Sequence, residues 1–454
     1  MFMETIYTPG VAHLSYVVGD GGQAAVVDPR RDTDIYLEAA YRQGAKITHI
    51  FETHRNEDYV TGAFDLAART GAAVHHGSQL DFRYGHPANE GDDFQLGDVK
   101  LSILHTPGHT LESISVVFRD LAFSEDPLGV FTGDTLFIGD VGRTDFFPER
   151  AEEVAGMLYD SIFQKLLPLG DHVLLWPAHG AGSVCGSGMA DRNFSTLGYE
   201  RQYNPALRNG DRRAFIAHKL AEEHFYPPYF KKMEKYNLEG PPPLTELPRP
   251  KPLAPDDFAR AMDSGMQVVD VRSPEAYAGA HIWGSFSLPL AMVPAFAGMF
   301  LEYDYPVGLV VEDYAQIDDA VRGLVRIGYD NIAAYLAGGL HAWETSGRRY
   351  GKIPAIHITD VEQRIDAGDP FTLLDVRSKE EFESGHLRGA KNVYLGDLPR
   401  QIDRIADGHP VTTYCNSGQR AMIAASLLKR RGIDLVENCL GSIAACKSLG
   451  CEME

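Results

Sequence analysis

The chain has 454 residues, is 44% hydrophobic and 23% charged, and carries a formal net charge of -21 at pH 7. This composition is that of a folded, water-soluble protein, and the length suggests about three domains of roughly 150 residues each. The acidic excess argues against a nucleic-acid partner, since phosphate binding needs clustered lysine and arginine. Without a leader-type start or a run of about 18 apolar residues, we expect a cytoplasmic protein with no membrane partner.

The first 70 residues alternate strand and helix signals. Residues 14–29 predict two strands around a glycine-rich turn, residues 33–42 a helix, and the apolar run 47–51 a strand. The polar stretch Thr53-His54-Arg55-Asn56-Glu57-Asp58-Tyr59 then precedes a helical segment at 60–70. Because sites in α/β folds often lie where a strand ends and a helix begins, this stretch is a candidate metal site.

Three later strand-like runs also end in ligand-type residues. They are 99–104 before His105-Thr106-Pro107-Gly108-His109, 129–132 before Gly133-Asp134, and 172–176 before Pro177-Ala178-His179-Gly180. A lone histidine after a strand is usually a turn residue, but four such strand ends in order indicate a site. By contrast, we expect His75 and His76 to face solvent at the end of a strand.

The order and spacing of these residues resemble the metallo-β-lactamase superfamily. Its pattern is His-x-His-x-Asp-His, then a His, a bridging Asp and a last His, which together build two adjacent zinc or iron sites for hydrolysis. This chain departs from the pattern at Asn56 and Tyr59, which stand where the family has histidines. Each change removes a ligand from a different site, so a binuclear hydrolase is not expected. The resemblance implies an αββα sandwich, whereas periodicity alone gives only α/β.

The residues kept without substitution are His54, His109 and Asp134. Two imidazoles and one carboxylate leave coordination positions open and suit non-haem Fe(II) better than closed tetrahedral zinc. Within the superfamily, this set resembles the iron triad of the persulfide dioxygenases. The segments 141–146, Val-Gly-Arg-Thr-Asp-Phe, and 179–186, His-Gly-Ala-Gly-Ser-Val-Cys-Gly, resemble those enzymes too.

Four further residues of the motif are expected around the metal: Asp58, His179, Asn56 and Tyr59. We predict that Asp58 and His179 orient ligands or waters, with a purely structural role as the alternative. The sequence leaves open whether Tyr59 contacts the metal.

A proline-rich stretch and an internal repeat divide the rest of the chain. Helical residues 195–236 complete a first domain at 1–240, and residues 241–255, with seven prolines, predict a semi-rigid linker. Residues 268–277 are then echoed by 373–382, at an offset of 105 residues. Two tandem domains at 256–350 and 351–454 follow from this repeat. Their Asp-Val-Arg and Gly-x-His or Gly-His segments resemble rhodanese domains.

The second copy carries a candidate nucleophile. A predicted strand at 410–414 ends in Cys415-Asn416-Ser417-Gly418-Gln419-Arg420, followed by a helical run at 421–431. A helix N-terminus and inward-pointing amides favour the thiolate. The four residues between Cys415 and Arg420 match the rhodanese active loop, so Asn416, Ser417, Gly418 and Gln419 would cradle a persulfide. Arg420 would hold the loop or an incoming anion.

The first copy lacks this chemistry. Alignment through Pro306 puts Val311 at the position of Cys415, and residues 310–316 contain no thiol, no arginine and two carboxylates. We expect a non-catalytic domain here.

The five cysteines, at 185, 415, 439, 446 and 451, are too few for a disulfide framework in a chain of this length. Cys439, Cys446 and Cys451 contain no CxxC pair and are expected to be free thiols rather than a metal site. The role of Cys185 stays open.

As a whole, the chain resembles the fused persulfide dioxygenase–sulfurtransferases. The resemblance implies mononuclear Fe(II), with a low-molecular-weight thiol persulfide (of glutathione, coenzyme A or a similar thiol) and O2 as substrates. Products would be sulfite and thiol, with Cys415 forming or using thiosulfate in sulfide detoxification by a homo-oligomer. Two alternatives remain: a zinc thioester hydrolase of the glyoxalase II type, and a metal-free scaffold carrying an active sulfurtransferase.

Overall fold

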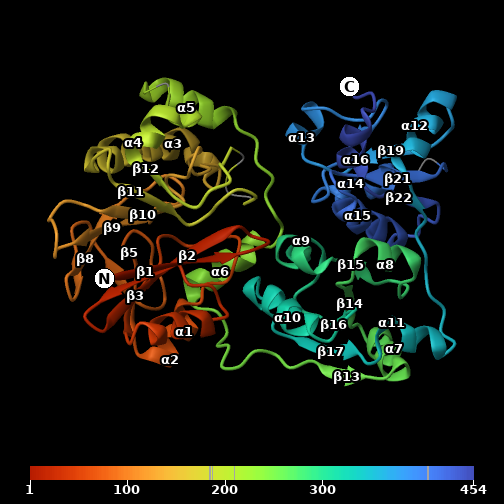
Figure 1. Ribbon diagram of the computed structural model, residues 1–454, viewed down its shortest axis with the longest axis horizontal. Coiled ribbons are helices and arrows are strands. Elements are labelled where there is room, and N and C mark those ends of the chain that lie inside the picture. The colour runs from red at the N-terminus through yellow and green to blue at the C-terminus, as the bar shows by residue number, and fades with distance from the viewer. Residues whose placement is uncertain (184–185, 187, 209, 406–407) are drawn as a thin grey trace. The chain divides into compact units, whose positions relative to one another are not determined.

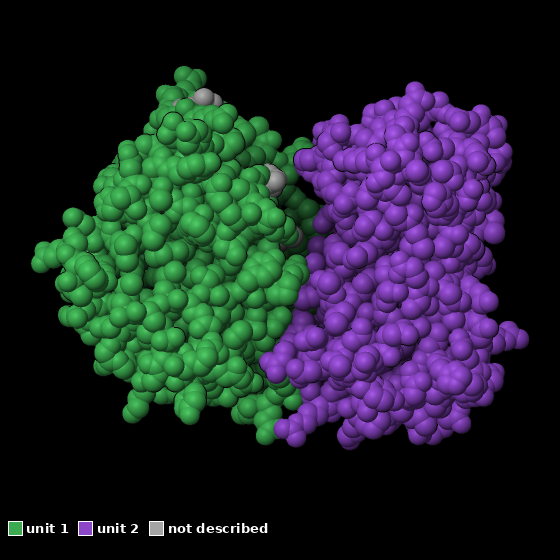
Figure 2. Space-filling view, in the orientation of Figure 1, with its two compact units in different colours: residues 1–247, 325–328 green, residues 248–324, 329–454 purple. Residues whose placement is uncertain are grey.

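The computed structural model describes residues 1–183, 186, 188–208, 210–405 and 408–454. It divides into two compact units, residues 1–247 with 325–328 and residues 248–324 with 329–454 (Figure 2). Cys185 and the centre of the 179–186 segment lie outside the described residues. Within the described part of the chain, no helix has both the length and the apolar character needed to cross a membrane.

The first unit contains two six-stranded sheets that enclose a shared core (Figure 1). One sheet has the order β1 (Phe2–Thr8), β2 (His13–Asp20), β3 (Gln23–Val27), β4 (Lys46–Phe51), β5 (Ala73–Gly77) and β6 (His86–Ala88). The other has the order β12 (Ser195–Thr196), β11 (Leu174–Pro177), β10 (Gly129–Gly133), β9 (Ile114–Asp120), β8 (Val99–His105) and β7 (Asp93–Leu96).

Helices cover the outer face of each sheet. Strand alternation explains why: Tyr16 and Val18 of β2 enter the core between the sheets, while Val17 packs outward against the helix layer. The first sheet is covered by α1 (Asp34–Arg42) and α2 (Ala63–Thr70), and the second by α3 (Ala151–Asp160), α4 (Leu197–Tyr203) and α5 (Arg212–Ala221). The predicted αββα sandwich is confirmed.

Two local expectations for this unit need correction. The helical stretch 195–236 is broken into α4, α5 and α6 (Phe230–Glu239), because Pro205, Pro227 and Pro228 interrupt the helix ladder. His75 and His76 are buried on β5 and do not face solvent. His75 satisfies its ring by a hydrogen bond between its Nε2 and Nδ1 of His49, 3.0 Å apart.

The second unit contains two five-stranded parallel sheets with the same strand order. The first copy has β13 (Lys251–Leu253), β17 (Ile332–Leu336), β16 (Val307–Val310), β14 (Gln267–Asp270) and β15 (Phe286–Ser287). The second has β18 (Ala355–Ile356), β22 (Val436–Cys439), β21 (Val411–Tyr414), β19 (Thr372–Asp375) and β20 (Lys391–Asn392). The helices of the first copy are α7 (Pro255–Asp263), α8 (Pro274–Gly279), α9 (Val293–Phe300), α10 (Gln316–Arg326) and α11 (Gly339–Thr345). Those of the second are α12 (Ile358–Ala367), α13 (Lys379–Glu383), α14 (Leu398–Gln401), α15 (Gln419–Arg430) and α16 (Ser442–Leu449).

The repeated Asp-Val-Arg segment braces each copy. In the second copy, both carboxylate oxygens of Asp375 accept hydrogen bonds from Arg377, which also donates to the carbonyl of Gly385 at 2.9 Å. Asp270 and Arg272 make the same pair in the first copy. The motif therefore ties the end of a central strand to the turn after the following helix.

Part of the predicted linker is a strand. Residues 251–253 form β13, which pairs with β17 at the edge of its sheet. An edge strand tolerates Pro252 because the N–H that proline lacks is not needed for a hydrogen bond to a neighbouring strand. The linker is accordingly shorter than 241–255.

Candidate metal centre and sulfur-transfer site

Both sheets of the first unit deliver ligand-type side chains to one edge of the sandwich. His54 follows β4 of one sheet, while His109 and Asp134 follow β8 and β10 of the other. Each of the three is at most 2% exposed. Asp134 Oδ2 lies 3.8 Å from His54 Nε2 and 3.5 Å from His109 Nε2. The structure thus brings together the three residues predicted as ligands.

A fourth group, Glu57, belongs to this cluster and was not among the predicted ligands. Its Oε1 lies 3.0 Å from His109 Nε2, and one ligand atom from each of His54, Glu57, His109 and Asp134 lies within 4.8 Å of the others. The family pattern treats position 57 as variable, so motif reasoning passed over it. The available signal was an additional carboxylate inside the polar stretch.

Hydrogen bonds fix the tautomers of both histidines so that each Nε2 faces the cluster. His109 Nδ1 donates to the carbonyl of Arg143 at 3.1 Å. The hydroxyl of Thr53 donates to Asp28 Oδ2 at 2.8 Å, so it accepts from His54 Nδ1, 3.0 Å away. Bonds of this kind to the far ring nitrogen are typical of metal-binding histidines.

Two of the atoms that face the cluster lack hydrogen-bond partners. His54 Nε2 and Asp134 Oδ2 are buried and make no hydrogen bond among the described residues, while His109 Nε2 contacts Glu57. Buried polar atoms are rarely left in this state, because each would cost about 1–3 kcal/mol. Two imidazoles and a carboxylate that converge in this way fit a divalent metal ion.

The 141–146 segment supports His109 from behind. The buried Arg143 guanidinium makes a two-bond contact with Asp145, with both distances 2.7 Å, and its Cζ lies 4.9 Å from the centre of the Phe146 ring. These contacts hold Arg143 in place, and its carbonyl accepts the hydrogen bond from His109 Nδ1. The segment therefore positions a ligand rather than supplying one.

His179 lies between two carboxylates at the edge of the cluster. Its Nδ1 donates to Asp134 Oδ1 at 2.7 Å, and its Nε2 lies 3.0 Å from Asp58 Oδ2. Burial alone would lower the pKa of His179, but Asp134 and Asp58 raise it well above its ordinary value. An imidazolium held between two carboxylates thus supplies positive charge where the family pattern has metal ligands.

The same network acts on the other groups of the cluster. Burial would raise the pKa of Asp134, but His179, His54 and His109 hold it well below its usual range. Burial would lower the pKa of His109, and Glu57 and Asp134 raise it instead. Asp134 therefore stays ionised and can act as an anionic ligand.

Asn56 and Tyr59 are buried beside the cluster but are not part of it. Asn56 Nδ2 donates to the carbonyl of His54 at 3.4 Å. The Tyr59 ring packs on His13 with centroids 4.2 Å apart, and its hydroxyl has no hydrogen-bond partner among the described residues. Asn56 Oδ1 is likewise buried without a hydrogen-bond partner among the described residues.

The second candidate site lies at the C-terminal end of β21. Cys415 directly follows this strand, is 1% exposed, and precedes α15. The backbone N–H of Gly418 points at its Sγ, 3.1 Å away, and the Cys415 N–H donates to Ser442 Oγ at 3.2 Å. Gly418 has φ +96°, a conformation that strongly favours glycine. The loop from 416 to 419 thus wraps around the sulfur.

Arg420 is anchored to α13. Its Nη1 and Nη2 each lie 2.7 Å from one carboxylate oxygen of Glu381, which also accepts the N–H of Ser378. Burial would raise the pKa of Glu381, but Arg420 lowers it below its ordinary value. Of the two roles predicted for Arg420, this contact fits holding the loop. Sequence analysis did not single out Glu381.

The equivalent loop of the first copy is closed on itself. Val311 follows β16 as Cys415 follows β21. Gln316 Oε1 accepts the backbone N–H groups of Glu312 and Asp313 at 2.9 and 3.2 Å. The amides that would face a persulfide are therefore used by a side chain of the same loop.

The remaining described cysteines are free thiols, and Cys439 lies beside the Cys415 loop, where its carbonyl accepts from Ser442 Oγ at 2.6 Å. Cys439 and Cys446 are buried, Cys451 is partly exposed, and all three are free. In the described ranges, the one group of ligand-type residues close enough to hold a metal is the cluster around Asp134.

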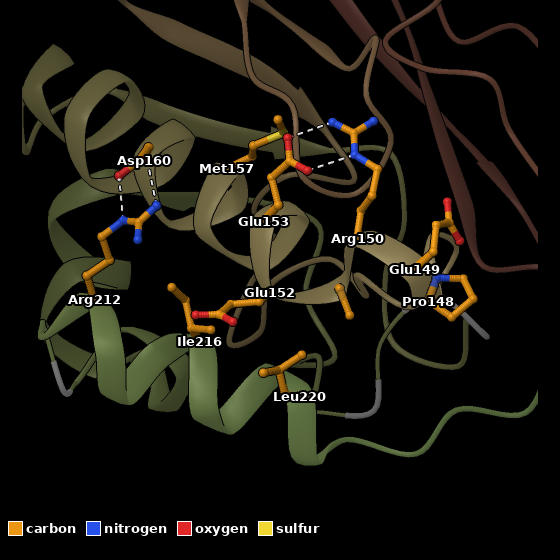
Figure 3. A pocket seen from close by; sticks show the side chains of 11 residues that line it. Pro148, Glu149, Arg150, Glu152, Glu153, Met157, Asp160, Arg212, Ile216 and Leu220 are labelled. Carbon is orange, nitrogen blue, oxygen red and sulfur yellow. Dashed lines mark hydrogen bonds and ion pairs between the residues drawn. The ribbon is translucent and has the colours of Figure 1, made fainter.

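A large surface groove in the first unit contains none of the predicted residues. It has a volume of about 750 Å³ and lies between α3 and α5 (Figure 3). Both of its arginines pair with carboxylates, Arg150 with Glu153 and Arg212 with Asp160. Because its cations are already matched and Glu149 and Glu152 also line it, the groove gives no indication of an anionic ligand.

Comparison with known proteins agrees with this arrangement. Residues 8–179 match the metallo-beta-lactamase superfamily, and residues 254–346 and 357–448 each match the rhodanese-like domain. The crystal structure of a metallo-beta-lactamase from Staphylococcus aureus subsp. aureus COL is similar with 33% identity, 74% of this chain and 98% of that chain covered, and a TM-score of 0.67. This chain belongs to the metallo-beta-lactamase superfamily. Its metallo-beta-lactamase domain is followed by two rhodanese-like domains, as predicted.

Two curated relatives differ in activity. The mitochondrial persulfide dioxygenase ETHE1 of Mus musculus is 28% identical over 221 residues, 46% of this chain and 76% of that protein. The hydroxyacylglutathione hydrolase GloC of Haemophilus influenzae is 27% identical over 219 residues, 43% of this chain and 93% of that protein. Another relative is longer, and this chain spans 56% of its length. The dioxygenase homology and the rhodanese-like domains together indicate an enzyme of sulfur metabolism.

Proposed function

We propose that the metallo-beta-lactamase domain is a mononuclear Fe(II) persulfide dioxygenase. The observation that carries this proposal is the convergence of the buried atoms His54 Nε2, His109 Nε2 and Asp134 Oδ2. Asn56 and Tyr59 stand where the family pattern has histidines, and among the described residues Asp58 and His179 pair with each other, which argues against a binuclear hydrolase. The reaction is RSSH + O2 + H2O giving RSH, sulfite and two protons.

Different side chains of the cluster would hold the iron and orient its ligands. His54, His109 and Asp134 would hold the iron, and Glu57 is close enough to serve as a further ligand or to leave when substrate binds. When bound, Fe(II) would supply adjacent positions for a thiolate-type sulfur and for oxygen. Thr53 and the Arg143 carbonyl hold both imidazoles with Nε2 toward the cluster, and His179 keeps Asp134 oriented through its second oxygen.

We further propose that the second rhodanese-like domain transfers sulfane sulfur. The Cys415 thiolate would attack the outer sulfur of a persulfide RSSH, releasing RSH and leaving a persulfide on Cys415. Sulfite would then attack that outer sulfur, giving thiosulfate and restoring the thiolate, or the transfer would run in reverse. The Gly418 amide, 3.1 Å from Sγ, supports an anionic sulfur in this position.

Oxygen consumption by anaerobically purified, iron-loaded protein tests the first proposal. Glutathione persulfide and coenzyme A persulfide would be supplied separately to wild type and to the His109→Ala and His105→Ala variants, each with metal analysis. We expect about one iron per chain and oxygen uptake in wild type. The His109→Ala variant should lose both, while His105→Ala should keep them, because His105 lies on β8 outside the cluster.

Zinc in the purified protein together with thioester hydrolysis and no oxygen uptake would overturn this proposal in favour of the hydrolase. Sulfite formation in a Cys415→Ser background, where transfer is blocked, separates the two reactions. If sulfite appears there and thiosulfate does not, each reaction belongs to the domain proposed for it.

A further inference from the structure

A small hollow lies between the two rhodanese-like domains of the second unit. It has a volume of about 50 Å³ and is lined by Tyr277, His281 and Ser285 of the first copy, Lys352 of the connection, and Lys429 and Arg430 of α15. A water molecule occupies about 30 Å³ in the liquid, whereas drug-sized ligands need several hundred. The hollow therefore has room for a small ion.

The charge of this hollow is one-sided. Lys352, Lys429 and Arg430 line it, and none of its lining residues is a carboxylate. This is unusual in a chain with a formal net charge of -21, where an acidic neighbour for each cation would be easy to find. A cluster of cations without a counter-charge is electrostatically unfavourable and would be relieved by an anion.

Arg430 is the clearest sign that a partner is missing. Its guanidinium carbon lies 3.7 Å from the centre of the Phe286 ring, so the side chain reaches from α15 to the first copy. It makes no ion pair with the described residues, while the adjacent Arg431 has a two-bond contact with Asp403, each bond 2.9 Å. Burial lowers the pKa of Arg430, as expected for a cation that is partly desolvated and unpaired.

The uncharged groups that line the hollow do not oppose an anion. His281 donates from Nδ1 to the carbonyl of Tyr277 at 3.0 Å. Burial lowers the pKa of His281 to about 4, and Lys429 contributes to the shift, so the ring is uncharged at neutral pH. The bridge between His281 and Gly351 places Lys352 beside this floor. Three segments of the chain thus supply cations and a polar floor to the hollow, and Lys429 Nζ also donates to the carbonyl of Asp434 at 2.5 Å.

We propose that this hollow is an anion site that binds one small oxyanion of the sulfate class through Arg430, Lys429 and Lys352. The class includes the sulfur oxyanions of the proposed function and also free phosphate. The site is distinct from the Cys415 loop, because α15 begins beside that loop and reaches Arg430 only after 12 residues, about 18 Å along its axis. An anion bound here would join the non-catalytic copy to the helix that carries the sulfur loop.

Equilibrium dialysis of the full chain tests the site without turnover. A Cys415→Ser background would be given labelled thiosulfate or labelled phosphate at constant ionic strength, with and without Arg430→Gln. Arg431→Gln is the matched control, since it removes the same charge one residue away. We expect Arg430→Gln to weaken the affinity of the hollow for its anion by about tenfold or more, because a charge-assisted hydrogen bond is lost. Arg430→Lys should restore part of this affinity.

Binding of both anions supports a general oxyanion site, and binding of thiosulfate alone supports a sulfur oxyanion site. Equal binding by the Arg430→Gln and Arg431→Gln variants, with unchanged melting temperatures, would overturn the proposal. Absence of saturable binding in the parent would do the same. None of these outcomes depends on oxygen chemistry, so the site can fail while the dioxygenase proposal stands, and the reverse.

Discussion

The two rhodanese-like domains share a strand order and a buried Asp–Arg brace, and they differ in the loop that follows the central strand. In the second copy, a backbone N–H of this loop points at Cys415 Sγ. In the first, two backbone N–H groups of the loop are bound by Gln316, and Val311 stands in place of the thiol. The fold was kept while the ability to bind an anion was replaced by an internal hydrogen bond.

Both partners of the supporting ion pair are absent from the first copy. Arg420 of the second copy pairs with Glu381. Their counterparts in the first copy are Gln316 and Ala276. One partner without the other would leave an uncompensated charge, which is more costly than having neither. The comparison teaches that Glu381 and the Cys415 loop occur together, although Glu381 lies outside the loop.

The metallo-beta-lactamase domain repeats this lesson within one site. In its first half, the metal-facing atoms of His54, His109 and Asp134 converge, while its second half is closed by His179 between Asp58 and Asp134. Glu57 lies 3.0 Å from His109 Nε2, and Asp58 lies 3.0 Å from His179 Nε2. Buried carboxylates and imidazoles thus contact one another in both halves, as expected where polar groups are taken out of water.

The largest expected effect tests the difference between the loops of the two rhodanese-like domains. Cys415→Ser should abolish sulfur transfer, with a loss of at least about a thousandfold, since the nucleophile is removed. Val311→Cys, in wild type or in that background, should add no activity because Gln316 occupies the loop amides. Thiosulfate and cyanide as substrates, with thiocyanate as the product measured, provide the assay. Activity gained by Val311→Cys would show that the first loop is not closed.

A second prediction concerns the closed half of the metal domain. Asp58→Asn removes a charge that holds His179, which in turn holds Asp134. We expect iron affinity to fall by about 10- to 100-fold, the usual cost of losing a group that orients a ligand. Competition with a metal chelator measures it, and Asp93→Asn on the exposed strand β7 is the control. Unchanged iron affinity would mean that the ion pair between Asp58 and His179 does not orient Asp134 for metal binding.

A third prediction sharpens the assignment of Glu381. Glu381→Gln keeps the shape but removes the charge that pairs with Arg420. We expect kcat/KM for sulfur transfer to fall by about tenfold, because a partly exposed two-bond ion pair of this kind contributes roughly 1 kcal/mol. The neighbouring Glu380→Gln leaves the pair intact and should be close to wild type. A purely structural role would lower the melting temperature and leave the kinetic constants unchanged.

The fold and the open parts of both sites could be anticipated from sequence because they follow strand ends. His54, His109, Asp134 and Cys415 each lie in the segment that follows a predicted strand, and the metal residues meet because β4, β8 and β10 of the two sheets end at the same edge of the sandwich. The repeated Asp-Val-Arg segment marked the tandem copies in the same way.

The groups that sequence reasoning missed act through side-chain contacts between distant segments. Glu57 sits at a variable position of the motif, and only its 3.0 Å approach to His109 reveals its place. Glu381 lies 39 residues before Arg420. The expectation for His75 failed because a hydrogen bond to His49, on another strand, allows the imidazole to be buried. No local pattern encodes such pairings.

The smallest expected effect tests that last point. Burial, with His49 and His86 nearby, lowers the pKa of His75 to about 4, from about 6.5 in the unfolded chain. Between pH 4 and 6.5, His75 binds a proton in the unfolded state but not in the folded state. The free energy of unfolding therefore falls as the pH is lowered from 6.5 towards 4, by at most about 1.4 kcal/mol per pH unit. His75→Gln should flatten this slope, while His86→Gln, at an exposed position, should not. Urea midpoints at several pH values provide the measurement. Parallel curves for wild type and His75→Gln would mean that the imidazole titrates normally inside the fold, and that its pairing with His49 is not what keeps it buried.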